Sequence, residues 1–354
     1  MNPIPASLRF VERRVLAGRR LLCADGKRLE ACGDLHALGL LANIVRERRH
    51  GPEASWVANA HLNYTNVCRN ACRFCAFGRK KGDPLAWEMS VPEIARRAAD
   101  AAASGATELH VTGGLHPDRP YAWYPRILRA IRRAAPRIRI KAIPAVEILH
   151  AARIGRRTAR AVLEDFRAAG LDALTGGGAD IFAPRVRRRI CPAKPSAAAW
   201  LDVHRTAHRL GIPTTATMLF GHVESAADRV DHLLRVRALQ DETGGFEAFV
   251  PLPFVPARTA LSRIPKPTAR AILREIAVSR LMLDNVDRIV AYWPMTGVDV
   301  ASVALWYGAD DLHGTVCGER IAHMAGADTP AGLPGAELER IIRAAGRSPV
   351  RRES

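Results

Sequence analysis

Two hydrophobic patterns alternate along the chain from about residue 54 onward. Short apolar runs, typical of buried strands, are followed by longer segments in which apolar residues recur every three or four positions, as in amphipathic helices. Glycine and proline residues separate the two patterns. The predicted strands cover residues 54–66, 108–112, 138–142, 171–175, 214–219, 246–250 and 288–292. The predicted helices cover residues 90–104, 121–135, 158–169, 196–210, 226–241, 269–284 and 298–306.

Strand–helix units that repeat at intervals of roughly 30–40 residues predict parallel strands joined by right-handed crossovers. Their number indicates an α/β fold of the (β/α)8 type, a TIM-like barrel, and residues 311–316 are predicted to close the ring. An open, doubly wound sheet is the alternative. In a barrel, functional side chains lie at the C-terminal ends of the strands, so the loops after each predicted strand are the places to look for a site.

The chain outside these units divides into two flanking segments. Residues 1–53 are predicted to form a helical extension, because leucines recur at helical spacing before the turn at Gly51 and Pro52. The barrel domain is expected over residues 54–327. A C-terminal helix and tail are expected over residues 328–354.

Composition limits the partners and the compartment. The 354 residues are 48% hydrophobic and contain no apolar run long enough to span a membrane, and the N-terminal residues have no apolar signal core. Seven cysteines are few for this length, so a reducing, cytoplasmic location is expected. The net charge of +18 suggests a nucleic-acid partner, but the basic residues are dispersed along the sequence and aromatic residues make up only 6% of it. No nucleic-acid partner is expected.

Three of the seven cysteines, Cys68, Cys72 and Cys75, lie in a C-x3-C-x2-C spacing directly after the first predicted strand. Thiolates so close together favour zinc or an iron–sulfur cluster. A structural zinc site usually has four protein ligands, whereas a four-iron cluster with three local cysteines keeps one iron open to a small molecule. A zinc knuckle and a disulfide pair remain alternatives. Cys23, Cys32, Cys191 and Cys317 carry no functional prediction.

Other candidate site residues follow later predicted strands. Thr112, Gly113 and Gly114 form a turn in which the backbone can approach a ligand closely. Glu147 lies among apolar residues, where a carboxylate is costly unless it is used. His116 and His222 are the polar groups expected in the cavity.

The cysteine spacing, together with the aromatic Phe74, resembles the signature of the radical S-adenosylmethionine (SAM) superfamily. The resemblance implies that the three cysteines hold a [4Fe–4S] cluster whose fourth iron binds SAM, and that Phe74 packs on the adenine. It implies that the Thr112–Gly114 turn contacts the methionyl amine of SAM. Leu115 stands where the superfamily pattern usually has an acid, so the side-chain part of that contact is absent. The remaining contacts implied for SAM are Asp180 for the ribose, Arg187 for the carboxylate, Met218 beside the adenine, and Glu147.

Longer runs resemble the aminofutalosine synthase family of menaquinone biosynthesis, among them HLNYTNVCRNACRFCAF, VTGGLHP, GGGADIF and GADDLHGTV. Members of this family more often have Glu at the position of Asp180. The resemblance implies that the 5′-deoxyadenosyl radical of SAM adds to 3-[(1-carboxyvinyl)oxy]benzoate and that 6-amino-6-deoxyfutalosine forms with loss of carbon dioxide as bicarbonate. It also implies an electron donor of the flavodoxin or ferredoxin type. Arg280 is a candidate partner for the substrate carboxylates.

Two alternatives remain open. One is a sister radical SAM enzyme, either dehypoxanthine futalosine cyclase or the component that couples tyrosine to the deazaflavin precursor. The other is a basic, zinc-bound nucleic-acid binder.

Overall fold

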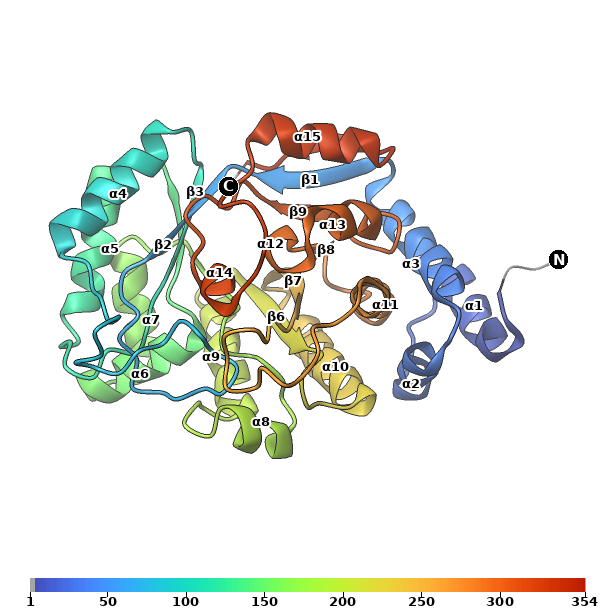
Figure 1. The fold of residues 1–354 in the computed structure, drawn as a ribbon, viewed down its shortest axis with the longest axis horizontal. Helices are drawn as coiled ribbons and strands as arrows, with labels where there is room; N and C mark the ends of the chain where they lie inside the picture. Colours follow the sequence, from blue (N-terminus) through green and yellow to red (C-terminus); the bar gives the residue numbers. More distant parts are fainter. Residues whose placement is uncertain (1–3, 354) are drawn as a thin grey trace.

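The computed structural model describes residues 4–353, and its centre is a curved sheet of seven parallel strands (Figure 1). The strands follow the order of the sequence around the sheet, so each strand pairs with the next one along the chain. They are β2 (Asn59–Asn63), β3 (Glu108–Thr112), β4 (Arg139–Ala142), β5 (Ala173–Leu174), β6 (Thr214–Phe220), β7 (Phe246–Pro253) and β8 (Arg288–Ile289). The predicted parallel α/β barrel is therefore confirmed.

Helices connect the strands and cover the outside of the sheet (Figure 1). Several of them begin where the sequence provides a capping hydroxyl: Ser90, Thr158, Ser196 and Thr268 each accept a backbone N–H of the first helical turn. These helices are α4 (Val91–Ala103), α5 (Trp123–Ala134), α6 (Ala145–Gly155), α7 (Ala159–Ala168), α8 (Pro184–Ile190), α9 (Ala197–Arg209), α10 (Ala226–Thr243), α11 (Ala269–Met282), α12 (Trp293–Thr296) and α13 (Val298–Ala304). Helix α6 was not predicted, because its first residues were assigned to the loop after β4.

A second, three-stranded parallel sheet closes the ring. It has the order β10-β1-β9 and contains β1 (Glu53–Val57), β9 (Asp311–Gly314) and β10 (Ser348–Arg351). Isolated bridges from Asp311 to Val290 and from Cys317 to Ala60 place the β9 segment between the two edges of the seven-stranded sheet. The predicted closing segment at 311–316 is confirmed, whereas the single strand predicted over 54–66 is divided into β1 and β2.

The N-terminal extension is helical, as predicted. It consists of the 3-10 turn η1 (Ala6–Leu8), α1 (Arg9–Leu16), α2 (Cys23–Ala31) and α3 (Leu35–His50). Helices α2 and α3 pack on the barrel helices α10 and α11, away from the mouth of the barrel (Figure 1). After β9 the chain forms α14 (Ile321–Ala325) and α15 (Gly335–Ala344) before β10.

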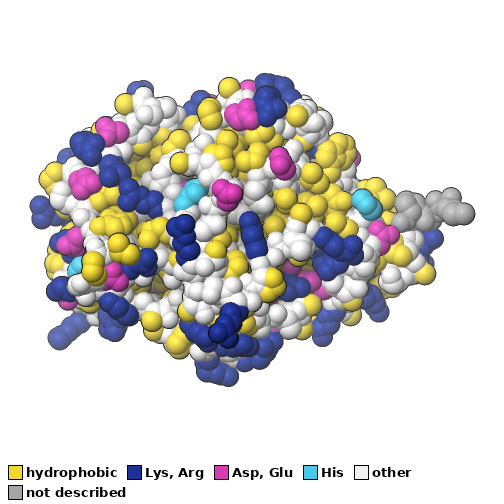
Figure 2. Space-filling view, in the orientation of Figure 1, with side chains coloured by type: hydrophobic (Ala, Val, Ile, Leu, Met, Phe, Trp, Pro, Cys, Tyr) yellow, Lys and Arg dark blue, Asp and Glu magenta, His cyan; other side chains and the backbone are white. Residues whose placement is uncertain are grey.

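Two surface observations bear on partners. Lys and Arg side chains are distributed around the face seen in Figure 2 and are not gathered into one patch. Among residues 4–353, no helix has both the length and the hydropathy needed to cross a bilayer.

Candidate active site

A cavity of about 370 Å³ extends from the C-terminal ends of the strands into the interior of the barrel. The residues that follow β2, β3 and β5 line its mouth: the cysteine loop, the turn Thr112–Gly114 and the glycines 176–178. Inward-facing residues of β6 and β7, such as Leu219 and Leu252, form an apolar wall. The sequence-predicted groups after different strands are thus brought together as the barrel fold requires.

The three cysteines Cys68, Cys72 and Cys75 all line this cavity and have free thiols. The start of their loop is tied to its end, since the Cys68 N–H donates to the Arg79 carbonyl (2.8 Å), and to the turn after β3, since the Arg69 N–H donates to the Leu115 carbonyl (2.9 Å). The Gly78 N–H donates to the Cys75 sulfur at 3.4 Å. The loop therefore presents all three sulfurs to one space.

This donor set fits the expected [4Fe–4S] cluster better than a single zinc ion. Within residues 4–353, the side chains close enough to share one metal ion are three histidines, and the cysteines are not among them. Three sulfurs that line one cavity without converging on a point suit a larger centre. Burial raises the pKa of the Cys72 thiol to about 12, so a positively charged centre is needed to hold it as a thiolate.

The turn after β3 is closely packed against the first loop. A Cβ atom on Gly113 would lie 2.4 Å from the ring of Tyr64, and one on Gly114 would lie 2.2 Å from the carbonyl oxygen of Val67. Only glycine fits at these two positions. The turn thereby exposes backbone to the cavity beside the cysteines.

Glu147 fixes this turn from below. It is 1% exposed, at the start of α6, and accepts the Gly113 N–H (3.0 Å) and the Tyr64 hydroxyl. Burial raises the pKa of Glu147 to about 8, although both hydrogen bonds act in the opposite direction. The carboxyl group is therefore partly protonated near neutral pH. It also lines the cavity, where the sequence placed it.

Asp180 lies on the opposite side of the cavity mouth, in a left-handed backbone conformation with φ of 48°. Both of its oxygens accept from the Lys194 ammonium at 2.9 Å. Burial opposes ionisation, but Lys194 and Arg187 offset it and hold the pKa of Asp180 below its usual value. The Lys194 nitrogen also lies 4.8 Å from the centre of the Phe74 ring, so it links the cysteine loop to Asp180.

Two residues predicted to contact SAM do not reach the cavity. The Arg187 guanidinium donates to the carbonyls of Ala179 and Pro195 (both 2.6 Å) and lies 3.9 Å from Asp180, so it positions the Asp180 loop. Met218 is fully buried on the outer face of β6, since side chains alternate along a strand and its neighbour Leu219 points inward.

The two predicted catalytic histidines likewise have local partners outside the cavity. His116 lies 3.2 Å from Glu88 and accepts the Asp118 N–H. His222 contacts the Leu219 carbonyl at 3.0 Å and Glu224 at 3.0 Å. Both rings hold turns that follow strands, because their nitrogens are used by nearby backbone and carboxylate groups.

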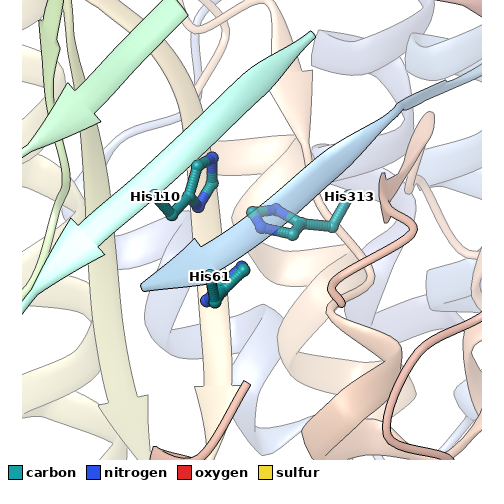
Figure 3. A group of neighbouring side chains, drawn as sticks. All are labelled: His61, His110 and His313. Atoms are coloured by element: carbon teal, nitrogen blue, oxygen red, sulfur yellow. The ribbon is translucent and has the colours of Figure 1, made fainter. Parts of the chain in front are cut away.

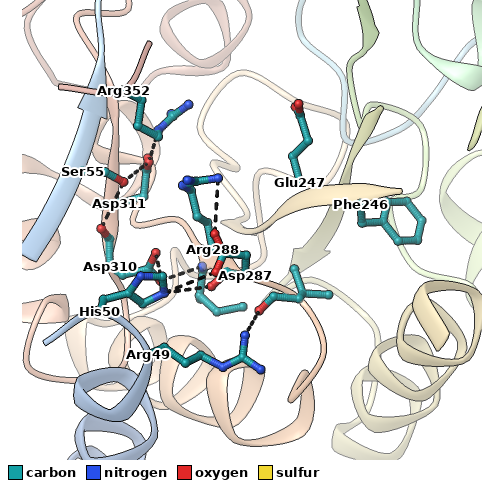
Figure 4. Close-up of polar contacts among 12 residues, drawn as sticks. Arg49, His50, Ser55, Phe246, Glu247, Asp287, Arg288, Asp310, Asp311 and Arg352 are labelled. Atoms are coloured by element: carbon teal, nitrogen blue, oxygen red, sulfur yellow. Dashed lines mark hydrogen bonds and ion pairs between the residues drawn. The ribbon is translucent and has the colours of Figure 1, made fainter. Parts of the chain in front are cut away.

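Arg280 is also not part of the cavity wall, which corrects its assignment as a substrate-binding residue. It is fully buried and donates to the Gly308 carbonyl (2.9 Å), the Asp287 carbonyl (3.0 Å) and the Asp310 carboxylate. Asp310 belongs to a network near β1 and β9 that includes His50 at 3.4 Å (Figure 4). The charge of Arg280 is therefore used to join α11 to this network.

The sequence analysis missed four polar residues inside the barrel: His61, His110, Lys141 and His313. Three of them are register partners, since His61 pairs with His110 and His110 with Lys141 across β2, β3 and β4. A polar residue at the same inward position of three consecutive strands was the signal that could have identified them. The three histidine rings face one another in Figure 3.

Comparisons with known proteins agree with this arrangement. The family model described as "Radical SAM superfamily" matches residues 62–236, and the one described as "CofH/MqnC C-terminal region" matches residues 243–354. The chain is 47% identical to aminodeoxyfutalosine synthase of Thermus thermophilus, over 97% of this chain and 94% of that protein. It is 41% identical to 5-amino-6-(D-ribitylamino)uracil–L-tyrosine 4-hydroxyphenyl transferase of Methanopyrus kandleri, over 88% and 86% respectively.

Among solved structures, methylornithine synthase superposes with a TM-score of 0.75 at 18% identity, covering 96% of this chain and 97% of that one. At that identity the likeness supports the fold alone. The two family models and the similarity over nearly the full length define the family. The chain is a radical SAM enzyme of the CofH/MqnC family, with a [4Fe–4S] cluster and SAM as its cofactors.

Proposed function

We propose that this protein is an aminofutalosine synthase of menaquinone biosynthesis. It transfers the 5′-deoxyadenosyl group of SAM to 3-[(1-carboxyvinyl)oxy]benzoate and leaves methionine. The product is 6-amino-6-deoxyfutalosine, formed with loss of carbon dioxide, which takes up water and leaves as bicarbonate. The observation that carries the proposal is the single cavity that links the cysteine loop to polar residues deep in the barrel. The 47% identity to a protein of that name supports this member of the family over its sisters.

In this proposal Cys68, Cys72 and Cys75 hold the [4Fe–4S] cluster. The reduced cluster supplies the electron that cleaves the sulfonium bond of SAM. The Gly113–Gly114 turn presents backbone to the methionyl group, and Glu147 keeps that turn in place through the Gly113 N–H. Phe74 offers an aromatic face for the adenine, and Asp180 offers carboxylate oxygens for the ribose hydroxyls.

The apolar wall of the cavity excludes water and other hydrogen donors from the reacting carbons. Leu219, Leu252 and Phe254 form this wall between the SAM region and the interior of the barrel. A radical that reacts with an enol double bond must be kept from abstracting hydrogen elsewhere, so a dry and closely fitted cavity favours addition. The interior end carries polar side chains, among them Lys141 and His110, which suit the polar groups of a substrate with two carboxylates.

The test is an anaerobic assay of the reconstituted protein with dithionite, SAM and the enol-ether benzoate, followed by mass analysis. We expect a product that contains the whole adenosyl group. The matched pair of variants is Cys75→Ala, which removes a proposed ligand, and Cys23→Ala, which removes an exposed cysteine of the N-terminal helices. Cys75→Ala should abolish both the brown colour near ~400 nm and turnover, and Cys23→Ala should change neither.

Free 5′-deoxyadenosine in stoichiometric amounts, with no adenosylated product, would contradict the proposal and point to a sister enzyme. The 41% identity to a 4-hydroxyphenyl transferase makes tyrosine with 5-amino-6-(D-ribitylamino)uracil the first alternative substrate pair to supply.

A further inference from the structure

Three histidines from distant parts of the chain meet in the interior of the barrel. His61 comes from β2, His110 from β3 and His313 from β9, and one ring nitrogen of each lies within 4.8 Å of the others. The ring centres are 4.8 to 5.9 Å apart. In Figure 3 the three rings converge on one space. This group, the histidine triad, lies apart from the cysteine loop, which the cluster uses.

Two of the three rings in the triad have a buried nitrogen without a hydrogen-bond partner. The Nε2 atoms of His61 and His313 are buried and have no hydrogen-bond partner. His110 has one partner, because its Nε2 lies 2.6 Å from Glu108 Oε1. A carboxylate can only accept, so the proton of His110 is on Nε2 and its Nδ1 carries a lone pair. A buried histidine whose far nitrogen is held by a carboxylate is the usual arrangement of a metal ligand.

All three rings are in the form that binds metals. Burial is the largest cause that lowers the pKa of His61, His110 and His313 below the ordinary value, and neighbouring rings lower it further at His61 and His313. The cations around the triad each have a carboxylate of their own: Lys141 pairs with Glu247 (3.2 Å), Arg139 with Glu108 (2.9 Å) and Arg352 with Asp311 (2.6 Å). The site therefore has no unbalanced positive charge to repel a metal ion.

The backbone at His313 is held in an unfavourable conformation. Its φ is 69°, in the left-handed region that a residue with a Cβ rarely adopts. The Asp311 carboxylate accepts the His313 N–H at 2.5 Å and fixes this turn at the end of β9. Strain of this kind is retained mainly where a side chain must be aimed at a particular point. Here it aims the His313 ring at His61 and His110.

We propose that the histidine triad binds a divalent metal ion of the zinc class as a second metal centre. Imidazole nitrogens suit zinc, and three of them leave its fourth position open, as in catalytic zinc sites. Zinc bonds of ~2.0–2.1 Å require each nitrogen to move by less than about 1 Å, which ring rotation provides.

The open position faces the same cavity as the cysteine loop, beside Lys141 and Tyr292. It suits a carboxylate oxygen, which zinc accepts readily as a ligand. That this carboxylate belongs to the enol-ether benzoate rests on the proposed function. The metal site itself does not.

The experiment uses the reconstituted holoenzyme, in which Cys68, Cys72 and Cys75 are occupied by the cluster and cannot take up zinc. The protein is equilibrated with Zn²⁺, passed through a desalting column under anaerobic conditions, and analysed for iron and zinc. We expect about one zinc per chain in the wild type. His61→Gln and His313→Gln should lower the zinc content at least tenfold and leave the iron content unchanged, and Glu108→Gln should weaken zinc binding ~10–100-fold.

His204→Gln is the matched control. This histidine is fully buried and, like His61 and His313, has an unpartnered Nε2, but it lies on α9 outside the barrel. It should keep both metals, and the iron content reports that each variant has folded. In the Co²⁺-loaded protein, benzoate should change the visible absorption of the metal.

Absence of zinc from the wild type, or equal zinc in the wild type and both triad variants, would overturn the inference. Benzoate binding that depends on Lys141 without any bound metal would overturn it as well, in favour of a direct anion site. A wild-type protein that retains no zinc after equilibration but forms the expected product would refute the second metal centre and leave the proposed function intact. Zinc binding by a chain that forms no 6-amino-6-deoxyfutalosine would support the second metal centre and contradict the proposed function.

Discussion

The ion pair between Asp180 and Lys194 permits a prediction that separates stability from cofactor binding. Lys194→Met removes the ammonium that contacts both Asp180 oxygens at 2.9 Å. At an effective dielectric constant of 20, two charges at that distance attract by about 6 kcal/mol before desolvation is considered. Both side chains are largely buried, 13% and 7% exposed, so the carboxylate cannot recover that energy from water.

Breaking a buried pair from one side costs about 3–5 kcal/mol. We expect the lower end of that range for Lys194→Met, because Arg187 remains 3.9 Å from the carboxylate. Asp180→Asn should cost a similar amount. The double variant should cost less than the two single variants together, since neither member of the Asp180–Lys194 pair is then left as a charge without the other. With a change of about 2 °C per kcal/mol, each single variant should lower Tm by roughly 5–10 °C.

The pH dependence gives an independent check. The pKa of Asp180 is lowered in the folded protein, so the pair stabilises the fold above the ordinary aspartate pKa and is lost as pH falls through the lowered value. The cost of Lys194→Met should therefore be full at pH 7 and shrink in acid. Thermal melts of cluster-free protein between about pH 2 and about pH 8 measure this.

SAM binding is the second readout of these variants. If Asp180 holds the ribose, the double variant should regain stability without regaining SAM affinity, which equilibrium dialysis of the reconstituted protein measures. Strictly additive stability costs would refute the ion-pair argument. Normal SAM affinity in Asp180→Asn would refute the role in ribose binding.

Three further predictions concern two residues of the site and the buried Arg280 outside it. In Gly114→Ala the added Cβ would lie 2.2 Å from the Val67 carbonyl oxygen, so this variant should lose at least ~1–3 kcal/mol of stability and bind SAM more weakly. Gly33→Ala is the control, because a Cβ at Gly33 would have no neighbouring atom within 4 Å, and it should change neither property. Arg280→Met should lower Tm, because it leaves Asp310 without its buried partner. KM for both substrates should stay unchanged in the protein that folds. A raised KM would return Arg280 to the substrate site. The pKa of Glu147 is raised to about 8 in the folded protein. As pH rises from about 4.5 to about 8, Glu147 ionises in the unfolded chain before it does so in the folded protein, so wild-type stability should decline. Glu147→Gln should flatten that decline in a series of thermal melts.

The sequence was sufficient for the order of strands and helices and for the residues at the strand ends. Parallel strands place their C-terminal ends on one side, so the cysteines, the Gly113–Gly114 turn and Asp180 could be grouped from strand assignment alone. Glu147 was identified because a carboxylate among apolar residues is costly unless it has a use.

The assignments that the structure does not support depend on side-chain direction and on pairing between distant segments. Met218 and Leu219 are adjacent, and only the register of β6 determines which of them faces the cavity. Arg280 has its partner thirty residues away, at Asp310. His313 reaches the triad only because β9 enters beside β1, which no local pattern indicates.

The pairing of β1 with both β9 and β10 also constrains how the enzyme is made. Strand β1 leads directly into β2 and the cysteine loop, yet its two neighbours are synthesised more than 250 residues later. A nascent chain on the ribosome therefore carries an unpaired strand edge next to the cysteine loop until β9 and β10 have been synthesised. The ring around the cysteine loop therefore closes only after β9 and β10 exist, so one of the first strands to be synthesised is among the last to gain both of its neighbours.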